Sequence, residues 1–362
     1  MEWTSSAYRY GEAVPGPVDL ACVVHCHSTY SDGTGTVPEI AAGAARAGAD
    51  VVLLTDHDTL DAKHRGEERW HGDVLVCVGE EVSPVGANHY LAFGLDEVID
   101  PGLPSADVQA AVRAAGGIGF LAHPFSKGSE RFKRPGMPTD ELGGEDYTGI
   151  ELWSWVTDTA EKLASVSDVV RFVVAPERVF DDPPAANLAA WDVLLRRRPV
   201  VALGGIDAHQ IGIRVAGRVP LRLMSYTRSF LHLRTHVLVD EPVSGEAPRD
   251  RDAIYAALGA GRCYLAIDSI APARGFSFAA PGAAPVAMGS EGPLDGGREL
   301  VARVPRPASL TLVHEGRSVA TASCTELRHR AEEPGAWRVQ ASLPAFGRQR
   351  TWIVSNPIYL RA

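Results

Sequence analysis

Short apolar runs alternate with amphipathic stretches over roughly the first 270 residues of the chain. We expect strands where the apolar runs lie, at residues 20–26, 49–55, 74–78, 89–93, 118–122, 149–152 and 200–206. A helix should follow the first run, because Thr36-Val37-Pro38-Glu39 forms a capping box with proline in the first turn and Gly48 supplies a stop. Further helices are expected at 185–197 and after N-caps at Ser105 and Asp250. This alternation predicts a parallel α/β fold, either a barrel or a doubly wound sheet.

The pattern changes after about residue 270. Residues 271–308 contain six prolines and six glycines, which is too many for regular elements. Short runs of alternating apolar and polar residues then continue to the C-terminus, as in strands of an antiparallel sheet. We therefore divide the chain into an N-terminal extension (1–19), an α/β domain (20–272) and a small antiparallel β domain (273–362).

Composition and charge narrow the class of protein. The 362 residues are 45% hydrophobic and 22% charged, and the formal net charge is −10, so we expect no binding to a nucleic-acid polymer or an anionic membrane. No apolar run is long enough to span a bilayer, and the first residues lack the pattern of a secretion signal. Five scattered cysteines suit a reducing compartment. These features predict a cytoplasmic protein.

Histidine and acidic residues cluster where the predicted strands end. A lone histidine there is usually an ordinary residue, but clusters at successive strand ends are improbable by coincidence, because that edge carries the sites of α/β folds. Imidazole and carboxylate ligands without thiolate suit Zn²⁺, Mn²⁺ or Fe²⁺. By contrast, His236 lies inside a strand pattern and is expected to be structural. The clusters are His25-Cys26-His27, Asp56-His57-Asp58, Glu80-Glu81, Asn88-His89, His123-Pro124 and Asp207-Ala208-His209.

These clusters also resemble the ordered motifs of a known family, the PHP-domain (polymerase and histidinol phosphatase) metallohydrolases. The resemblance covers roughly residues 20–270. Residues 234–266 and the ending Ser355-Asn356-Pro357-Ile358-Tyr359 resemble, more loosely, its carbaryl-hydrolase-like (CehA/McbA) branch. The matching stretches are residues 25–33, 55–57, 79–81, 88–89, 123–124 and 207–209.

The resemblance implies a distorted (β/α)7 barrel that holds two to three divalent ions (Mn, Zn or Fe). It implies a first metal on His25, His27, Glu81 and Asp207. Glu81 would bridge to a second metal on His89 and His123. Asp32, His57 and His209 would hold a third, and Asp56 and Asp58 would act as outer carboxylates that orient ligating imidazoles.

Cationic side chains in loops near these motifs are candidates for binding a substrate phosphate. Arginine forks match phosphate oxygens, and loops at the edge of a site carry specificity. Arg214, shortly after His209, is the first choice and Arg131 the second; any one of these cations is more often a solvated surface charge. Asp207 or His209 could shuttle protons.

Three functions remain open from the sequence. The first is a phosphoesterase that hydrolyses a small phosphorylated molecule, such as a nucleotide, by attack of a metal-bridging hydroxide. The second is a metallohydrolase of carbamate, ester or amide bonds, and the third is a metal-stabilised binding module without turnover. We expect a small-molecule substrate as the partner, and leave open self-association into a homo-oligomer.

Overall fold

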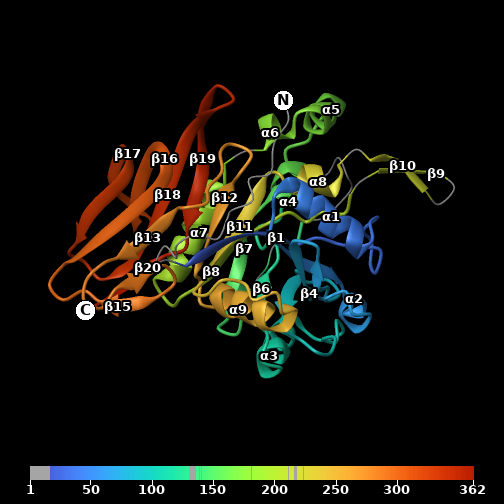
Figure 1. Cartoon of the computed structure of the whole chain (residues 1–362), viewed down its shortest axis with the longest axis horizontal. Coiled ribbons are helices and arrows are strands. Elements are labelled where there is room, and N and C mark those ends of the chain that lie inside the picture. Colours follow the sequence, from blue (N-terminus) through green and yellow to red (C-terminus); the bar gives the residue numbers. More distant parts are fainter. Residues whose placement is uncertain are drawn as a thin grey trace.

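The computed structural model describes residues 17–362 except 130–135, 138, 140, 181, 211, 216, 217 and 223, and only the backbone of 212–215 and 218–222. It is a mixed α/β structure with one large hydrogen-bonded sheet. In Figure 1 the helices and shorter strands occupy one side, and the long C-terminal strands in orange and red occupy the other.

The seven predicted strands all form, within a few residues of their expected limits. They are β1 (Val18–Val24), β2 (Val51–His57), β4 (Val74–Val82), β5 (Tyr90–Phe93), β6 (Ile118–Leu121), β7 (Gly149–Ser154) and β8 (Val201–Gly205). They pair in the order β1-β2-β4-β5-β6-β7-β8. The run curves back on itself, because the Ile206 amide bonds the Val24 carbonyl and the His27 amide bonds the Ala208 carbonyl. The carboxyl ends of β1 and β8 are therefore neighbours.

One strand departs from the predicted parallel arrangement. β5 pairs antiparallel with both β4 and β6, whereas β1, β2 and β4 are mutually parallel and so are β6, β7 and β8. Only residues 83–89 connect β4 to β5. A parallel connection needs a crossover of a dozen or more residues, so this short connection can only reverse the chain.

The helices agree with the capping signals except at two starts. α1 (Val37–Ala47) has the expected capping box, with the Thr36 amide 2.9 Å from Glu39 Oε2, and it ends at Gly48, which has a φ of 75°. α3 (Ser105–Ala114) begins at Ser105, so Pro104 is its N-cap. α9 (Ala247–Gly259) begins before Asp250, whose carboxylate instead accepts hydrogen bonds from the amides of Ser244 and Gly245. The other helices are α2 (Asp61–His64), α4 (Trp155–Ala160), α5 (Val166–Val174), α6 (Pro176–Val179), α7 (Ala185–Leu195), α8 (Tyr226–Ser229) and a 3-10 turn (Glu141–Gly143).

The sheet continues beyond β1 through antiparallel strands. β11 (Leu233–Val239) pairs with β1, β12 (Cys263–Ile267) pairs with β11, and β19 (Arg348–Ser355) pairs with β12. β18 (Gly335–Ala345), β16 (Arg298–His314) and β17 (Arg317–Ala331) follow in antiparallel order. The remaining strands are β3 (Trp70–His71), β9 (Gly212–Val215), β10 (Arg218–Arg222), β13 (Ser277–Ala280), β14 (Val286–Ala287), β15 (Glu291–Pro293) and β20 (Ile358–Arg361).

Buried apolar residues form three clusters. One contains alternate residues of the shorter strands, such as Cys22, Leu53 and Leu203, and a second packs the opposite faces of these strands against the helices. The third lies among the C-terminal strands around Trp352. No helix in the described part of the chain is both long and apolar enough to cross a membrane.

Candidate metal centre

The predicted ligands come from separate strands and meet at one edge of the sheet. His25 and His27 follow β1, His57 ends β2, Glu81 lies in β4, His123 follows β6, and Asp207 and His209 follow β8. His89 lies just before β5, and the reversed direction of that strand brings its start to the same edge. β5 therefore contributes its ligand from its beginning, whereas β4 and β6 contribute theirs from their ends.

The Glu81 carboxylate lies at the middle of the group. It is 1% exposed, and five imidazoles have a ring nitrogen within ion-pair distance of it. Glu80, the neighbouring acid, points the other way and accepts a hydrogen bond from the Ile99 amide. The distances to Glu81 are 3.0 Å from His25 Nε2, 3.2 Å from His27 Nε2, 3.5 Å from His57 Nδ1, 2.8 Å from His89 Nδ1 and 3.4 Å from His123 Nε2.

Asp207 closes the buried side of the group. Its Oδ1 lies 3.6 Å from His25 Nε2 and 3.4 Å from His27 Nε2, so both imidazoles lie between two carboxylates. The same oxygen is 3.5 Å from His209 Nδ1. The Thr157 hydroxyl of α4 donates a hydrogen bond to Asp207 Oδ2 at 3.3 Å, which fixes the orientation of the carboxylate.

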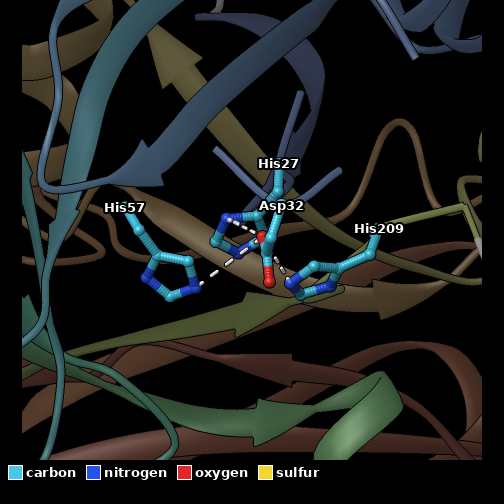
Figure 2. Close-up of side chains that lie close together, drawn as sticks. All are labelled: His27, Asp32, His57 and His209. Carbon is cyan, nitrogen blue, oxygen red and sulfur yellow. Dashed lines mark ion pairs between the residues drawn. The ribbon is translucent and has the colours of Figure 1, made fainter. Parts of the chain in front are cut away.

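Asp32 forms the more open side of the group (Figure 2). Its side chain is 54% exposed, and its Oδ1 lies 3.2 Å from His209 Nε2, 3.8 Å from His27 Nδ1 and 3.9 Å from His57 Nε2. His57 and His209 are 26% and 20% exposed, whereas His25 is fully buried. The centre therefore opens to solvent on the side of Asp32.

Four sets of these residues have ligand atoms close enough together to share an ion. All four sets overlap, because His25, His27, His57 and Glu81 each belong to two of them. His89 joins a set with His57, and His123 joins one with Asp207, which differs from the pairing of His89 with His123 that the resemblance implies. The sets are His25–His27–Glu81, His25–His123–Asp207, His57–Glu81–His89 and His27–Asp32–His57–His209.

Electrostatics at the centre favour bound positive charge. Burial lowers the pKa of His25, but Glu81, Glu151 and Asp207 outweigh it and raise that pKa well above its usual value. For His27, burial also lowers the pKa, but Asp207 and Glu81 outweigh it and raise that pKa to about 9. Burial raises the pKa of Glu81, but the surrounding imidazoles outweigh it and hold that pKa well below its usual value. The carboxylates stay ionised, as ligands of a cation must.

Unsatisfied polar atoms show that the described side chains do not complete their own bonding. Both ring nitrogens of His27 and Nδ1 of His123 are buried without a hydrogen bond to any described residue. A buried polar group without a partner costs about 1–3 kcal/mol, so such atoms call for a ligand. Imidazole and carboxylate donors fit a divalent transition-metal ion.

The backbone is strained at three of the predicted ligands. His25, His123 and Asp207 have φ values of 66°, 30° and 57°, in the left-handed region that residues other than glycine rarely adopt. His25 thus lies just beyond the regular strand, and simple strand alternation does not explain how it shares a direction with His27. Each such residue costs on the order of 1–3 kcal/mol and persists where the surroundings hold it, commonly at functional sites.

The two predicted outer carboxylates, Asp56 and Asp58, bond residues of the loops around the centre. Asp56 accepts hydrogen bonds from the Ser28 amide and hydroxyl at 2.7 and 2.6 Å and from the Ser31 hydroxyl at 2.6 Å. Asp58 accepts from the Ser83 amide, and the Ser83 hydroxyl in turn contacts His57 Nδ1 at 2.8 Å. Asp58 therefore reaches an imidazole through Ser83, whereas the described contacts of Asp56 are to the loop that follows His27.

A third outer carboxylate, Glu151, contacts the ring of a predicted ligand directly. Both of its oxygens lie 3.3 Å from His25 Nδ1. Glu151 matches none of the sequence motifs, so it was not among the predicted site residues. The available signal was an acidic residue inside the apolar run of β7.

The predicted phosphate-binding arginines are not placed in the centre. Arg131 lies outside the described residues, and Arg214 has a described backbone in β9 but no described side chain. Both stay predictions.

Comparisons with known proteins add distant likenesses only. No protein-family model matches the sequence, and a search of curated proteins gives no match. The chain is similar to a two-domain protein from Bacteroides vulgatus that contains a predicted PHP-like metal-dependent phosphoesterase, with 16% identity, a TM-score of 0.42 and coverage of 97% of this chain and 100% of that chain. It is also similar to an amidohydrolase from Chromobacterium violaceum with bound sulfate and no metal, with 17% identity, a TM-score of 0.31 and coverage of 52% and 87%. At such distances we argue function from the residues of the centre alone.

Proposed function

We propose that this protein is a metal-dependent phosphoesterase of the PHP type, which hydrolyses a small phosphorylated substrate such as a nucleotide. The observation that carries the proposal is the meeting of all nine predicted ligands at one edge of the sheet, around Glu81, Asp207 and Asp32. Phosphoester chemistry comes from the resemblance of the sequence motifs to that family.

The residues of the centre would hold two to three divalent ions, which we propose to be Mn, Zn or Fe. Ions bound there would supply an activated water near neutral pH and neutralise charge that develops on the attacked group. The buried side, formed by His25, His27, Glu81 and Asp207, would hold its ion most tightly, because its imidazoles are buried and lie between two carboxylates. The set around Asp32 would be the weaker site, since that carboxylate is half exposed.

The open side of the centre is where we place the substrate. Asp32, His57 and His209 are the exposed members of the group, so an incoming phosphate would meet them first. His209 Nδ1 is 3.5 Å from Asp207 Oδ1, and one of these two residues would take the proton that the attacking water loses and return it to the leaving oxygen. Arg214 and Arg131 would bind phosphate oxygens from the flanking loops.

The finer organisation belongs to the same proposal. We propose that residues 20–272 form a distorted (β/α)7 barrel and residues 273–362 a separate β domain, in a cytoplasmic enzyme of the carbaryl-hydrolase-like branch. The curved run from β1 to β8 supports the barrel. The Trp352 cluster supports the β domain.

Elemental analysis and two chromogenic substrates test the function. We would load the purified protein with Mn²⁺ or Zn²⁺, count bound metal, and assay p-nitrophenyl phosphate and p-nitrophenyl acetate side by side. Two to three ions with phosphatase turnover are expected. Metal with esterase turnover alone would favour carbamate or ester hydrolysis. Metal without turnover on a wider phosphoester panel would favour a binding module, and no metal under any loading condition would overturn the centre itself.

A further inference from the structure

Glu151 is a buried carboxylate that contacts two predicted ligands without belonging to any of the sets that could share an ion. It is 1% exposed, and both oxygens lie 3.3 Å from Nδ1 of His25. Glu151 Oε2 also accepts a hydrogen bond from the His123 amide at 2.7 Å. One side chain therefore touches both the ring of His25 and the backbone of His123.

With a metal ion bound at Nε2, the contacts of His25 select the neutral tautomer that carries its hydrogen on Nδ1. Nδ1 faces only acceptor oxygens of Glu151, so it must carry the hydrogen. Nε2, at 3.0 Å from Glu81 and 3.6 Å from Asp207, is then the nitrogen that offers a lone pair to the centre. An outer carboxylate that bonds the far nitrogen of a ligating imidazole sets its tautomer, its ring orientation and its basicity.

The contact at His123 acts on strained backbone. His25 and His123 both have positive φ values, and Glu151 bonds each of them, one through the ring and one through the amide. Strain of this kind persists only where neighbouring groups hold it. Glu151 is placed to hold two of the three strained ligands.

Two local features aim the Glu151 side chain at the centre. The pairing of β7 with β8 slips by one residue between Glu151 and Trp153, as a β-bulge does when it redirects a side chain. Opposite it, Gly205 leaves the room the carboxylate needs, because a Cβ at that position would lie 2.0 Å from Glu151 Oε1. The glycine and the bulge are both explained by the need to seat this carboxylate.

We propose that Glu151 is a positioning residue that keeps a hydrogen on Nδ1 of His25, so that Nε2 is the nitrogen that binds the metal, and that holds the backbone turn at His123, so that both imidazoles are oriented toward the centre. The inference rests on the proposed metal centre.

The test compares Glu151→Gln, which preserves the shape of the side chain, with Asp192→Asn as the matched control. Asp192 is likewise a buried carboxylate, but it pairs with Arg338 at 2.8 Å and touches no predicted ligand. Zn²⁺ and Mn²⁺ affinities of the metal-free proteins would be measured by competition with a fluorescent chelator. Glu151→Gln should weaken the tightest site by about 10- to 100-fold, the usual effect of losing such an outer partner. Asp192→Asn should leave the affinity unchanged.

A spectroscopic readout separates positioning from general stability. In metal-free protein labelled with ¹⁵N-histidine, the Nδ1 proton of His25 should give a downfield resonance that disappears in His25→Asn and moves in Glu151→Gln. The visible spectrum of the Co²⁺-loaded protein should change in Glu151→Gln, because the ligand field changes when His25 reorients. Asp192→Asn should alter neither signal, even where it lowers the unfolding midpoint.

A second variant displaces the Glu151 carboxylate by a change in the neighbouring strand β8. Gly205→Ala places a methyl group where Glu151 Oε1 lies, so it should weaken metal binding as Glu151→Gln does. The double variant Gly205→Ala/Glu151→Gln should lose less than the sum of the two single losses, because both changes act through one contact.

The outcomes distinguish this inference from the proposed function. Unchanged metal affinity together with an unmoved His25 resonance in Glu151→Gln would overturn the positioning role. Loss of one whole bound ion at saturating metal would overturn it too, since Glu151 would then be a ligand. If the wild-type protein binds no metal, the proposed function fails, and a moved His25 resonance would still establish the Glu151 contact.

Discussion

Two histidine–carboxylate clusters of opposite character lie near the two ends of β1. Beside the start of β1, His236 lies fully buried between Asp19, at 2.7 Å from Nδ1, and Asp268, at 3.3 Å from Nε2. Tyr264 donates a further hydrogen bond to Asp19, and Arg234 pairs with Asp268. Every polar atom of the His236 ring has a partner, and its backbone is regular strand.

Beyond the other end of β1, the centre around Glu81 combines similar residue types with unsatisfied ring nitrogens and strained backbone. Buried ionic groups that are fully paired need no ligand from outside the chain. The imidazoles of the centre are packed against one another, but some of their ring nitrogens have no hydrogen-bond partner among the described residues. Both clusters contain histidine and acidic residues. What separates the structural cluster from the ligand-binding one is whether every polar side-chain atom has a hydrogen-bond partner within the chain.

Loss of a ligand should give the largest effect and should be confined to the centre. His25→Ala or Asp207→Asn should reduce turnover below detection and lower the metal content, because each removes a ligand of the site proposed to bind its ion most tightly. Turnover and elemental analysis of the folded variants measure this. Near-normal activity in both variants would contradict the assignment of these residues as metal ligands.

The same kind of change at the opposite end should act on stability alone. His236→Ala leaves two largely buried carboxylates, 15% and 11% exposed, without their shared partner, which should cost about 3 kcal/mol of unfolding free energy. Urea unfolding of the metal-free protein gives the number. A loss of bound metal in this variant would erase the distinction between the two clusters.

The pH dependence of stability should identify the paired cluster. Burial lowers the pKa of His236, but Asp19 and Asp268 outweigh it and raise that pKa to about 9. Because the folded pKa lies above the unfolded one, this stabilisation is complete below the unfolded pKa of about 6.5 and is lost as pH rises through about 9. The wild type should lose about 3 kcal/mol more than His236→Gln over that interval. Urea unfolding of both proteins measures this. An equal change in their unfolding free energies across that pH range would contradict the prediction.

Added metal should stabilise through the centre. At a free Zn²⁺ concentration of about 100 times the dissociation constant, one site should add about 2.7 kcal/mol to the unfolding free energy. Thermal and urea unfolding with and without a chelator measure the gain. It should vanish from the tightest site in His25→Ala and persist in His236→Gln; the reverse pattern would place the metal at the wrong end of the strands.

The smallest expected effect concerns substrate choice. Arg214→Ala should raise KM or lower kcat for p-nitrophenyl phosphate and change little for p-nitrophenyl acetate, since a guanidinium matters to a charged phosphate and not to a neutral ester. If neither substrate responds, Arg214 is a surface residue.

The sequence predicted those parts of the molecule that depend on local pattern. Apolar runs gave seven strands, and the capping box with Gly48 gave both ends of α1. The preference for Glu81 over Glu80 followed from a motif, and β4 directs Glu81 to the centre while Glu80 bonds the Ile99 amide.

The sequence could not predict features that depend on distant contacts. Glu151 acquires its role only because β7 pairs with β8 and Gly205 leaves it space, and neither fact is visible within 149–152. The grouping of His57 with Glu81 and His89 arises from the reversal at β5, which follows from the length of one connection. Left-handed backbone at His25 and His123 likewise depends on surrounding packing.

The side chain of Asn356 links the end of the chain to the strand before Asp207. Its Oδ1 accepts from the Ala202 amide of β8, and its Nδ2 donates to the carbonyls of Ala202 and of Cys263 in β12. The bonds to Ala202 join residues 154 positions apart, and the bond to Cys263 joins residues 93 positions apart. During synthesis on the ribosome, β8 therefore receives this partner only after residue 356 has emerged, long after the ligands at its own end, Asp207 and His209.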